Sequence, residues 1–146
     1  MTDTTPIDRF HKEYDFLSNF YEHPIVADHL RYPTLEHAFQ AAKTEHIKEK
    51  TTIAAAKTPG KAKRLGRKVT LVPDWDDRKV RIMLQLVRKK FEHKKLRQLL
   101  LQTGNRPLIE GNNWGDTFWG MCKGRGQNHL GKILEQVREE IRQEES

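Results

Sequence analysis

Hydrophobic residues recur at intervals of three and four along most of this 146-residue chain, the spacing that places side chains on one face of a helix. The most regular stripe follows Pro73-Asp74 and consists of Val80, Met83, Leu84, Val87 and Phe91. The predicted helices span residues 35–43, 46–57, 59–67, 74–91, 94–103 and 128–142. Helices therefore dominate the predicted fold.

Short strands are predicted between some of these helices. A turn at Ala27-Asp28-His29 is expected to join residues 24–26 to residues 30–32 as a hairpin. Residues 69–72 and 108–110 are aliphatic or β-branched and each predict another short strand. We expect a compact, helix-dominated α+β fold, with a single domain over residues 10–142 and a flexible N-terminus at residues 1–9.

The helix that starts after Thr34 carries the first candidate site. Thr34 can cap the first backbone amides, which places Glu36 on the first turn. Glu36, Gln40 and Lys43 stand at i, i+4 and i+7, so they form a polar edge beside the apolar face. A first-turn carboxylate also gains stability from the helix dipole without any function. This stretch alone does not decide whether Glu36 lines a functional site or only stabilises the start of the helix.

Two other positions combine aromatic and polar groups. Ser18 and Asn19 precede Phe20, an arrangement that suits a hydrogen-bonding wall beside a pocket, or a capped turn whose aromatic rings lie in the core. Trp75 lies at a helix start and outside the apolar stripe. It is either a cover on the core or a flat surface on which a planar ligand stacks.

The segment from Gly111 to Gly131 has an unusual composition for a plain connection. It holds six glycines, two tryptophans and three asparagines in 21 residues. Glycine lets backbone approach a ligand closely and tryptophan offers a flat face, so loops of this kind commonly carry function. Asp116 lies between Trp114 and Trp119, which places a carboxylate in apolar company. The alternative is a structural loop held by its own tryptophans.

The chain is basic, with 27 Lys and Arg residues against 20 Asp and Glu residues and a net charge of +7. This excess favours phosphate-bearing partners without choosing among nucleic acids, nucleotides and sugar phosphates. The charge is most concentrated in one segment, whose cations are Lys57, Lys61, Lys63, Arg64, Arg67 and Lys68. This basic segment is either a solvated surface or a phosphate-binding patch.

Cysteine and histidine usage gives no sign of a metal or a disulfide. Cys122 is the only cysteine, and the histidines show no zinc-binding spacing. No apolar run has the length or position of a signal peptide or a membrane span. We therefore expect a cytoplasmic protein without a metal and without a membrane partner.

Several of these stretches together resemble the NADAR (YbiA-like) family of N-glycosidases. The resemblance covers residues 10–138 and is carried, in matching order, by YDFLSNFY, YPTLEHAFQAAK, Asp74-Trp75, Leu108-Ile109-Glu110, GDTFWG and GQNHLGKIL. Cys122 and Glu135 depart from the family pattern, which often has glycine and methionine there. These departures affect the rim of the pocket and the choice of substrate, and neither removes a carboxylate.

The resemblance implies cleavage of the C–N bond between a phosphorylated ribose and a nitrogenous base or amine. Family substrates include ADP-ribose attached to guanine and phosphoribosyl-aminopyrimidine intermediates of riboflavin synthesis. We favour an enzyme that removes ADP-ribose from ADP-ribosylated guanine, so that its partner is an ADP-ribose substrate, including one carried on DNA. The alternatives are hydrolysis of the riboflavin intermediates and a non-catalytic module that binds ADP-ribose or nucleic acid.

Hydrolysis of an N-riboside passes through a ribosyl cation and needs negative charge, a positioned water and help for the departing nitrogen. Glu36 is expected to be the general acid/base and Asp116 to stabilise the cation, although these roles can be exchanged. Water is the second substrate, so no cofactor is expected. The residues expected to bind substrate are Ser18, Asn19, Phe20, Gln40, Lys43, Trp75, Trp119, Gly120 and Asn128.

Overall fold

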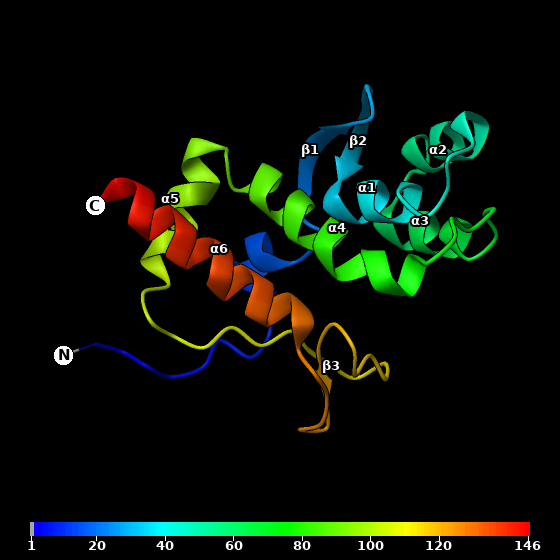
Figure 1. The fold of residues 1–146 in the computed structure, drawn as a ribbon. Coiled ribbons are helices and arrows are strands. Elements are labelled where there is room, and N and C mark those ends of the chain that lie inside the picture. Colours follow the sequence, from blue (N-terminus) through cyan, green and yellow to red (C-terminus); the bar gives the residue numbers. More distant parts are fainter. Residues whose placement is uncertain (1) are drawn as a thin grey trace. The chain divides into compact units, whose positions relative to one another are not determined.

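The computed structural model describes residues 2–146, in which helices alternate with a few short strands (Figure 1). The elements are the 3-10 helix η1 (Lys12–Leu17), β1 (Glu22–Ala27), β2 (Leu30–Thr34), α1 (Leu35–Ala41), α2 (Ile47–Ala54), α3 (Pro59–Gly66), α4 (Trp75–Lys90), α5 (Lys94–Gln102), β3 (Gly111–Asn112), β4 (Met121–Cys122) and α6 (His129–Glu145). The prediction of a helix-dominated α+β fold with few short strands is confirmed.

These elements belong to two compact units. The central unit consists of residues 19–90 and contains β1, β2 and α1 to α4. The terminal unit combines the residues up to Ser18 with residues 91–146 and contains η1, α5, β3, β4 and α6. Each unit is described separately below.

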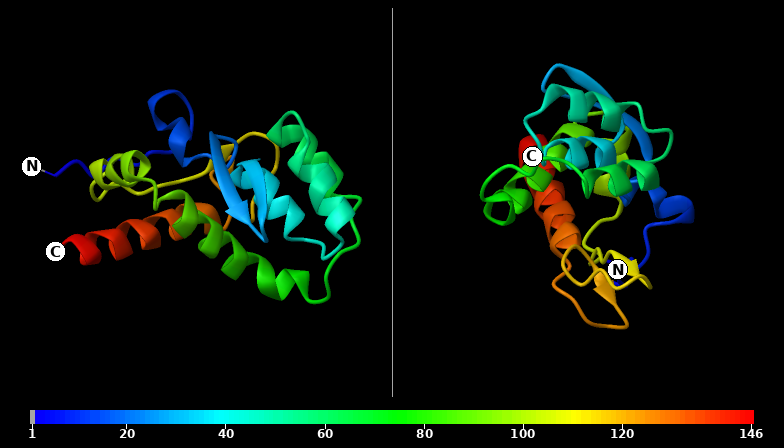
Figure 2. Two further views of the ribbon diagram at one scale, coloured as in Figure 1. Left: turned by 90° about the horizontal axis from the view of Figure 1, so that it is seen from above. Right: turned by 90° about the vertical axis from the view of Figure 1, so that its right-hand side faces the viewer.

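The central unit begins with the predicted hairpin. β1 pairs antiparallel with β2, and Ala27 lies opposite Leu30. Asp28 and His29 form the turn with φ angles of 51° and 64°. Positive φ at both central residues is what a tight two-residue turn between twisted strands requires. The hairpin prediction is confirmed, and the hairpin and α1 pack against α4 (Figure 2).

The start of α1 is determined by the residue that precedes it. Thr34 is extended, with φ −142° and ψ 165°, and its hydroxyl accepts a hydrogen bond from the His37 amide at 3.2 Å. The His37 ring lies buried between the Thr34 hydroxyl (2.8 Å) and the Ala56 carbonyl oxygen (2.9 Å). The predicted cap is confirmed, and α1 is anchored at its first turn.

The segment between α3 and α4 is not the predicted strand. No residue from 69 to 72 pairs with a strand in the described part of the chain. Instead, the Thr70 amide donates to the Glu49 carboxylate, and the Val72 amide donates to the Lys43 carbonyl oxygen at 2.7 Å. The prediction was wrong because β-branched composition forms a strand only where a neighbouring strand supplies partners.

In the terminal unit, α5 and α6 lie side by side (Figure 1). Arg138 of α6 is buried, and its guanidinium donates to the Thr103 hydroxyl and to the Arg106 carbonyl oxygen. Burial lowers the pKa of Arg138 from its ordinary value, and the nearby Glu135 opposes this effect. α6 matches the helix predicted at residues 128–142, and its buried apolar face consists of Leu130, Ile133, Leu134, Val137 and Ile141.

The strand predicted at residues 108–110 is reduced to one bridge, between Leu108 and Ile7. The Leu108 amide donates to the Glu135 carboxylate, and the Glu110 amide donates to the Asn128 side chain. The hydrogen bonds of the Leu108 and Glu110 amides are therefore made to side chains instead of to a neighbouring strand. For this reason the strand does not extend. Ile7 is buried, although it lies in the segment that was expected to be flexible.

The close approach of α3 to α1 depends on Gly66. A Cβ at Gly66 would overlap the Gln40 Oε1 atom and would lie 2.8 Å from Gln40 Cδ. The same addition at Gly60 of α3 meets no atom closer than 4.0 Å. Gly66 therefore sets how closely α3 packs on the side of α1 that carries Gln40.

We predict that Gly66→Ala lowers the free energy of unfolding by about 1–3 kcal/mol, because α3 or the Gln40 side chain must shift. The matched control, Gly60→Ala, should be neutral or stabilising by up to about 1 kcal/mol, because alanine favours helix and finds open space there. Urea denaturation of both variants measures the difference. Equal midpoints for the two variants would contradict a tight contact at Gly66.

Candidate active site

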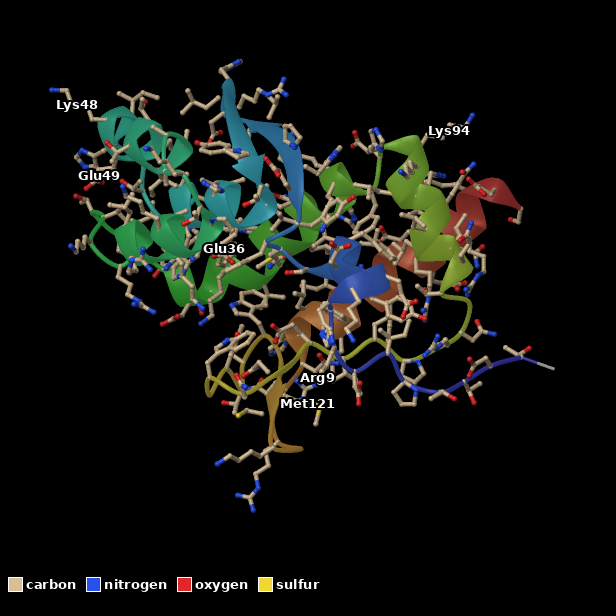
Figure 3. All side chains as sticks on the ribbon, turned by 180° about the vertical axis from the view of Figure 1, so that it is seen from behind. Arg9, Glu36, Lys48, Glu49, Lys94 and Met121 are labelled. Atoms are coloured by element: carbon tan, nitrogen blue, oxygen red, sulfur yellow. The ribbon has the colours of Figure 1, made fainter. Side chains whose placement is uncertain are left out.

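Glu36 is a buried carboxylate held on the first turn of α1 (Figure 3). It is 8% exposed, and its Oε2 accepts a hydrogen bond from Gln40 Nε2 at 2.6 Å. Its backbone amide donates to the Asn19 carbonyl oxygen at 3.0 Å. Burying a carboxylate is unfavourable unless it is bonded, so these contacts fix both the position and the orientation of Glu36.

Gln40 orients Glu36 and retains one unused polar atom. Gln40 is buried, and its Oε1 has no hydrogen-bond partner among residues 2–146. This oxygen is directed at Gly66, the position where a Cβ would overlap it. Buried acceptors without a partner are uncommon and are typical of places where a ligand or an ordered water binds. Gln40 thus holds the Glu36 carboxylate through its Nε2, while its own oxygen is enclosed against α3.

Lys43 extends the same edge of α1 into a cluster of cations. Burial lowers the pKa of Lys43, and Glu36 opposes this effect. Three more cations lower the pKa further, namely Arg67, Lys63 and Lys79. We call Lys43, Lys63, Arg67 and Lys79 the Lys43 cluster. Repulsion among like charges at one place is typical of a site that binds an anion.

The structure divides the basic segment. Lys63 and Arg67 belong to the Lys43 cluster, whereas Lys57 and Lys61 are exposed and have no resolved effect on Lys43. Lys79 was not predicted, because it lies on α4 outside the basic segment and forms an ion pair with Asp76. The sequence held one signal for Lys79. This lysine lies four residues after Trp75, another expected site residue, and residues four apart are neighbours on a helix surface.

Trp75 is 8% exposed, and its ring centroid lies 5.2 Å from that of Phe39 at an interplanar angle of 51°. This packing favours the interpretation of Trp75 as a cover on the core. Phe20 is 46% exposed. Asn19 bonds Glu36 through its backbone, and its Nδ2 lies 3.5 Å from Met83 Sδ. Of these aromatic residues, Phe20 therefore offers the larger surface to a ligand.

In the terminal unit, Asp116 organises the glycine-rich segment. Its Oδ1 accepts hydrogen bonds from the amides of Phe118 (3.1 Å) and Trp119 (2.9 Å). The Asn112 side chain bonds both the amide and the carbonyl oxygen of Asp116. In the part of the chain that the structure describes, Oδ2 has no hydrogen bond or ion pair. One carboxylate oxygen thus shapes the loop and the other is available to a ligand.

The aromatic residues of this segment pack on one another. Phe118 lies edge-on to Trp119, with ring centroids 4.8 Å apart, and lies 4.4 Å from the His129 ring. These contacts support the alternative in which the loop is held by its own aromatic residues. Trp114 was not among the expected substrate residues, yet it is 63% exposed. It is the more open of the two tryptophans for stacking.

Gly120 and Asn128 hold the loop together. The Asn128 side chain accepts from the Glu110 amide and donates to the Leu108 carbonyl oxygen. The Gly120 carbonyl oxygen accepts from the Asn128 amide, and a Cβ at Gly120 would overlap Glu110. Both residues therefore position the backbone of the loop.

The structure brings the expected site residues together in two groups. Asn19, Glu36, Gln40 and Lys43 are neighbours in the central unit, through hydrogen bonds or charge. Asp116 and Trp119 are neighbours in the terminal unit, which also contains Gly120, Asn128 and, at its edge, Ser18. Among residues 2–146, no group of three His, Cys, Asp or Glu side chains is arranged to hold a metal ion. None of the helices in those residues has the length and apolar composition of a membrane span.

The family sequence model of the NADAR domain matches residues 7–142 of this chain. This chain belongs to the NADAR family. A Nostoc punctiforme protein named as an N-glycosidase is 44% identical over 136 residues, which cover 88% of this chain and 86% of that protein. A Vibrio vulnificus protein named as a riboflavin biosynthesis protein is 35% identical over 136 residues, which cover 90% of this chain and 37% of that protein.

The fold of this NADAR protein is similar to the NMR structure of the Escherichia coli protein YbiA, with a TM-score of 0.86 and 36% sequence identity. The similarity covers 99% of this chain and 89% of YbiA. The family predicted from the sequence motifs is confirmed. The expectation of an enzyme that hydrolyses N-glycosyl bonds is confirmed at the level of the family, since its curated relatives include proteins named N-glycosidase.

Proposed function

We propose that this NADAR protein removes ADP-ribose from ADP-ribosylated guanine, including guanine in DNA, by hydrolysing the N-glycosyl bond. The observation that carries the proposal is the buried Glu36, bonded to Gln40 and adjoining the Lys43 cluster. A phosphorylated riboside needs both features, because its C–N bond requires acid/base help and its phosphates require cations.

Glu36 accepts a proton from the attacking water and returns a proton to the nitrogen of the departing base. Gln40 keeps the carboxylate in one orientation by donating to Oε2. The bond between the ribose of ADP-ribose and the guanine nitrogen breaks as the water oxygen bonds to that ribose carbon, so the products are ADP-ribose and unmodified guanine, which stays in the DNA when DNA is the substrate. Asp116 stabilises the positive charge that develops on the ribose through its available Oδ2.

The Lys43 cluster fits a ligand with about two negative charges. The cluster holds four cations, and two carboxylates adjoin it, Glu36 beside Lys43 and Asp76 paired with Lys79. ADP-ribose carries two linked phosphates, whereas a phosphoribosyl-aminopyrimidine carries one. Each linked phosphate carries about one negative charge, and a phosphate monoester carries about 1.5 to 2, so the charge of the cluster fits either substrate and a product assay decides between them.

The second candidate function is hydrolysis of phosphoribosyl-aminopyrimidine intermediates. The name of the Vibrio vulnificus relative favours this candidate. A product assay with ADP-ribosylated DNA and the riboflavin intermediates, side by side, separates the two. If kcat/KM for release of ADP-ribose is much higher than for the riboflavin intermediates, the proposal is supported. Faster release of ribose phosphate favours the alternative. Binding of either substrate without any product indicates a non-catalytic module.

We predict that Glu36→Gln lowers kcat at least about a hundredfold, because the acid/base group is lost. A glutamine can still accept the hydrogen bond from Gln40, so the melting temperature should change little. Glu22→Gln, an exposed position in the same unit, is the matched control and should keep normal turnover. Normal kcat in a folded Glu36→Gln protein would refute the role of Glu36.

Asp116→Asn should reduce kcat about a hundredfold while substrate binding is retained, because the charge acts mainly in the transition state. The asparagine oxygen can still accept from the Phe118 and Trp119 amides, so the loop should keep its shape. Single-turnover kinetics and a binding assay on the variant separate the two effects. The control is Asp8→Asn, at an exposed site in the same unit; loss of binding with unchanged single-turnover rate would contradict this role.

Neutralising Lys63 and Arg67 together, as glutamines, should raise KM several-fold and weaken the salt dependence of kcat/KM, with kcat nearly unchanged. The reason is that ground-state phosphate contacts and steering act before the bond breaks. The matched control neutralises Lys57 and Lys61 of the same basic segment, which have no resolved effect on Lys43. Identical effects of the two double variants would show that general charge, rather than the Lys43 cluster, recruits the substrate.

A further inference from the structure

A pocket lies in the central unit, on the face of α1 opposite Glu36. Its volume is about 540 Å³, which is within the range of pockets that bind small molecules. α1 contributes Ala38 and Ala42, which follow Glu36 by two and six residues and therefore point to the other side of the helix. Glu36, Gln40 and Lys43 do not line it. The pocket is thus separate from the proposed catalytic residues.

Small and apolar side chains make up one part of the wall. The two alanines of α1 leave room where larger residues would fill the space between α1 and α4. The apolar lining residues are Ala27, Ala38, Ala42, Val72, Ile82 and Leu86. This part of the pocket suits a ligand with an apolar body.

Tyr32 supplies a buried hydrogen-bond donor. It is 1% exposed, and its hydroxyl has no hydrogen-bond partner among residues 2–146. Burial, and to a smaller degree the charge of Asp28, raises the pKa of Tyr32 to about 12, so the hydroxyl stays protonated near neutral pH. A buried hydroxyl without an acceptor is unfavourable, and a ligand that brings an acceptor removes that cost.

The charged groups of the wall leave an excess of donors. Lys50 Nζ bonds Asp28 Oδ2 at 3.0 Å and the Ala41 carbonyl oxygen at 3.1 Å, so it and Asp28 compensate each other. The Arg78 guanidinium, in contrast, makes no hydrogen bond or ion pair with any residue that the structure describes. Glu45 also lines the pocket but is exposed. Lys89 Nζ, also on the wall, donates to the Val26 carbonyl oxygen at 3.2 Å. The Tyr32 hydroxyl and the Arg78 guanidinium are therefore donors of the wall that have no acceptor among residues 2–146.

We propose that this pocket binds a small organic anion, whose acid group bonds the Tyr32 hydroxyl and the Arg78 guanidinium while its apolar body packs on Ala38 and Ala42. The site is independent of the proposed N-glycosidase activity, because neither Glu36 nor Asp116 lines the pocket.

The test uses benzoate as the probe and benzyl alcohol as its neutral counterpart of similar shape. The full chain is labelled at its alanine methyl groups, and the Ala38 and Ala42 signals are followed by NMR during each titration. Benzoate should shift both signals with a dissociation constant of about 1–10 mM, as expected for so small a ligand. Benzyl alcohol and inorganic phosphate should bind at least about tenfold more weakly, since each lacks one of the two features. Equal binding of benzyl alcohol, or no saturable shift with benzoate, overturns the proposal.

Three variants locate the anion. Arg78→Gln and Tyr32→Phe should each weaken benzoate binding about tenfold, because each removes one donor. Arg81→Gln, at an exposed position on the same helix α4, is the matched control and should bind benzoate normally. If Arg78→Gln and Tyr32→Phe bind as tightly as the control, the anion lies elsewhere and the proposal fails.

The Tyr32 variant also gives a measurement that does not depend on any ligand. Tyr32→Phe removes a hydroxyl without a protein partner, so the melting temperature of the free protein should be unchanged or higher. A melting temperature lowered by several degrees would show that the hydroxyl is already bonded in the free protein. In that case Tyr32 has no donor to offer, and the proposed anion site is wrong.

Discussion

The hydrogen bond from Gln40 to Glu36 is the constraint on which the central unit depends. A buried carboxylate must be bonded, and its 2.6 Å partner lies one helical turn away on α1. The Gln40 side chain fits at this position only because residue 66 of α3 is a glycine, since a Cβ there would overlap Gln40 Oε1. The cap by Thr34 then fixes where the helix begins and hence where Glu36 lies. The position of Glu36 therefore depends on Gly66 of α3 and on Thr34 before α1.

This arrangement gives α1 two different faces. One face carries Glu36, Gln40 and Lys43, and burial, followed by repulsion from neighbouring cations, lowers the pKa of Lys43. The opposite face carries Ala38 and Ala42, which border a pocket instead of filling a core. Because the helix is short and anchored at its first turn, a ligand on either face contacts the same rigid element. The alternation of polar and small residues along α1 therefore provides two separate surfaces for binding.

Features determined by local interactions could be predicted from the sequence. The cap at Thr34, the turn at Asp28-His29 and the apolar face of α6 depend on residues close together in the chain. The spacing of Glu36 and Gln40 also predicted that they would be neighbours. The strands expected at residues 69–72 and 108–110 failed because pairing depends on distant partners, here Glu49, Lys43, Glu135 and Asn128. Lys79 was missed for the same reason, since its effect on Lys43 arises only from packing of α4 near α1.

The glycine-rich segment shows why composition identifies a functional loop better than it identifies functional residues. Most of its polar side chains bond the loop itself: Asn112 bonds Asp116, and Asn128 replaces the missing strand partner of residues 108–110. Asp116 divides its two oxygens, with Oδ1 on two backbone amides and Oδ2 available. A sequence gives no means of distinguishing an asparagine that supports the loop from one that meets a ligand. The distinction follows from the polar atoms that the folded loop has already used: Asn112 and Asn128 are bonded within the loop, whereas Asp116 keeps Oδ2 available to a ligand.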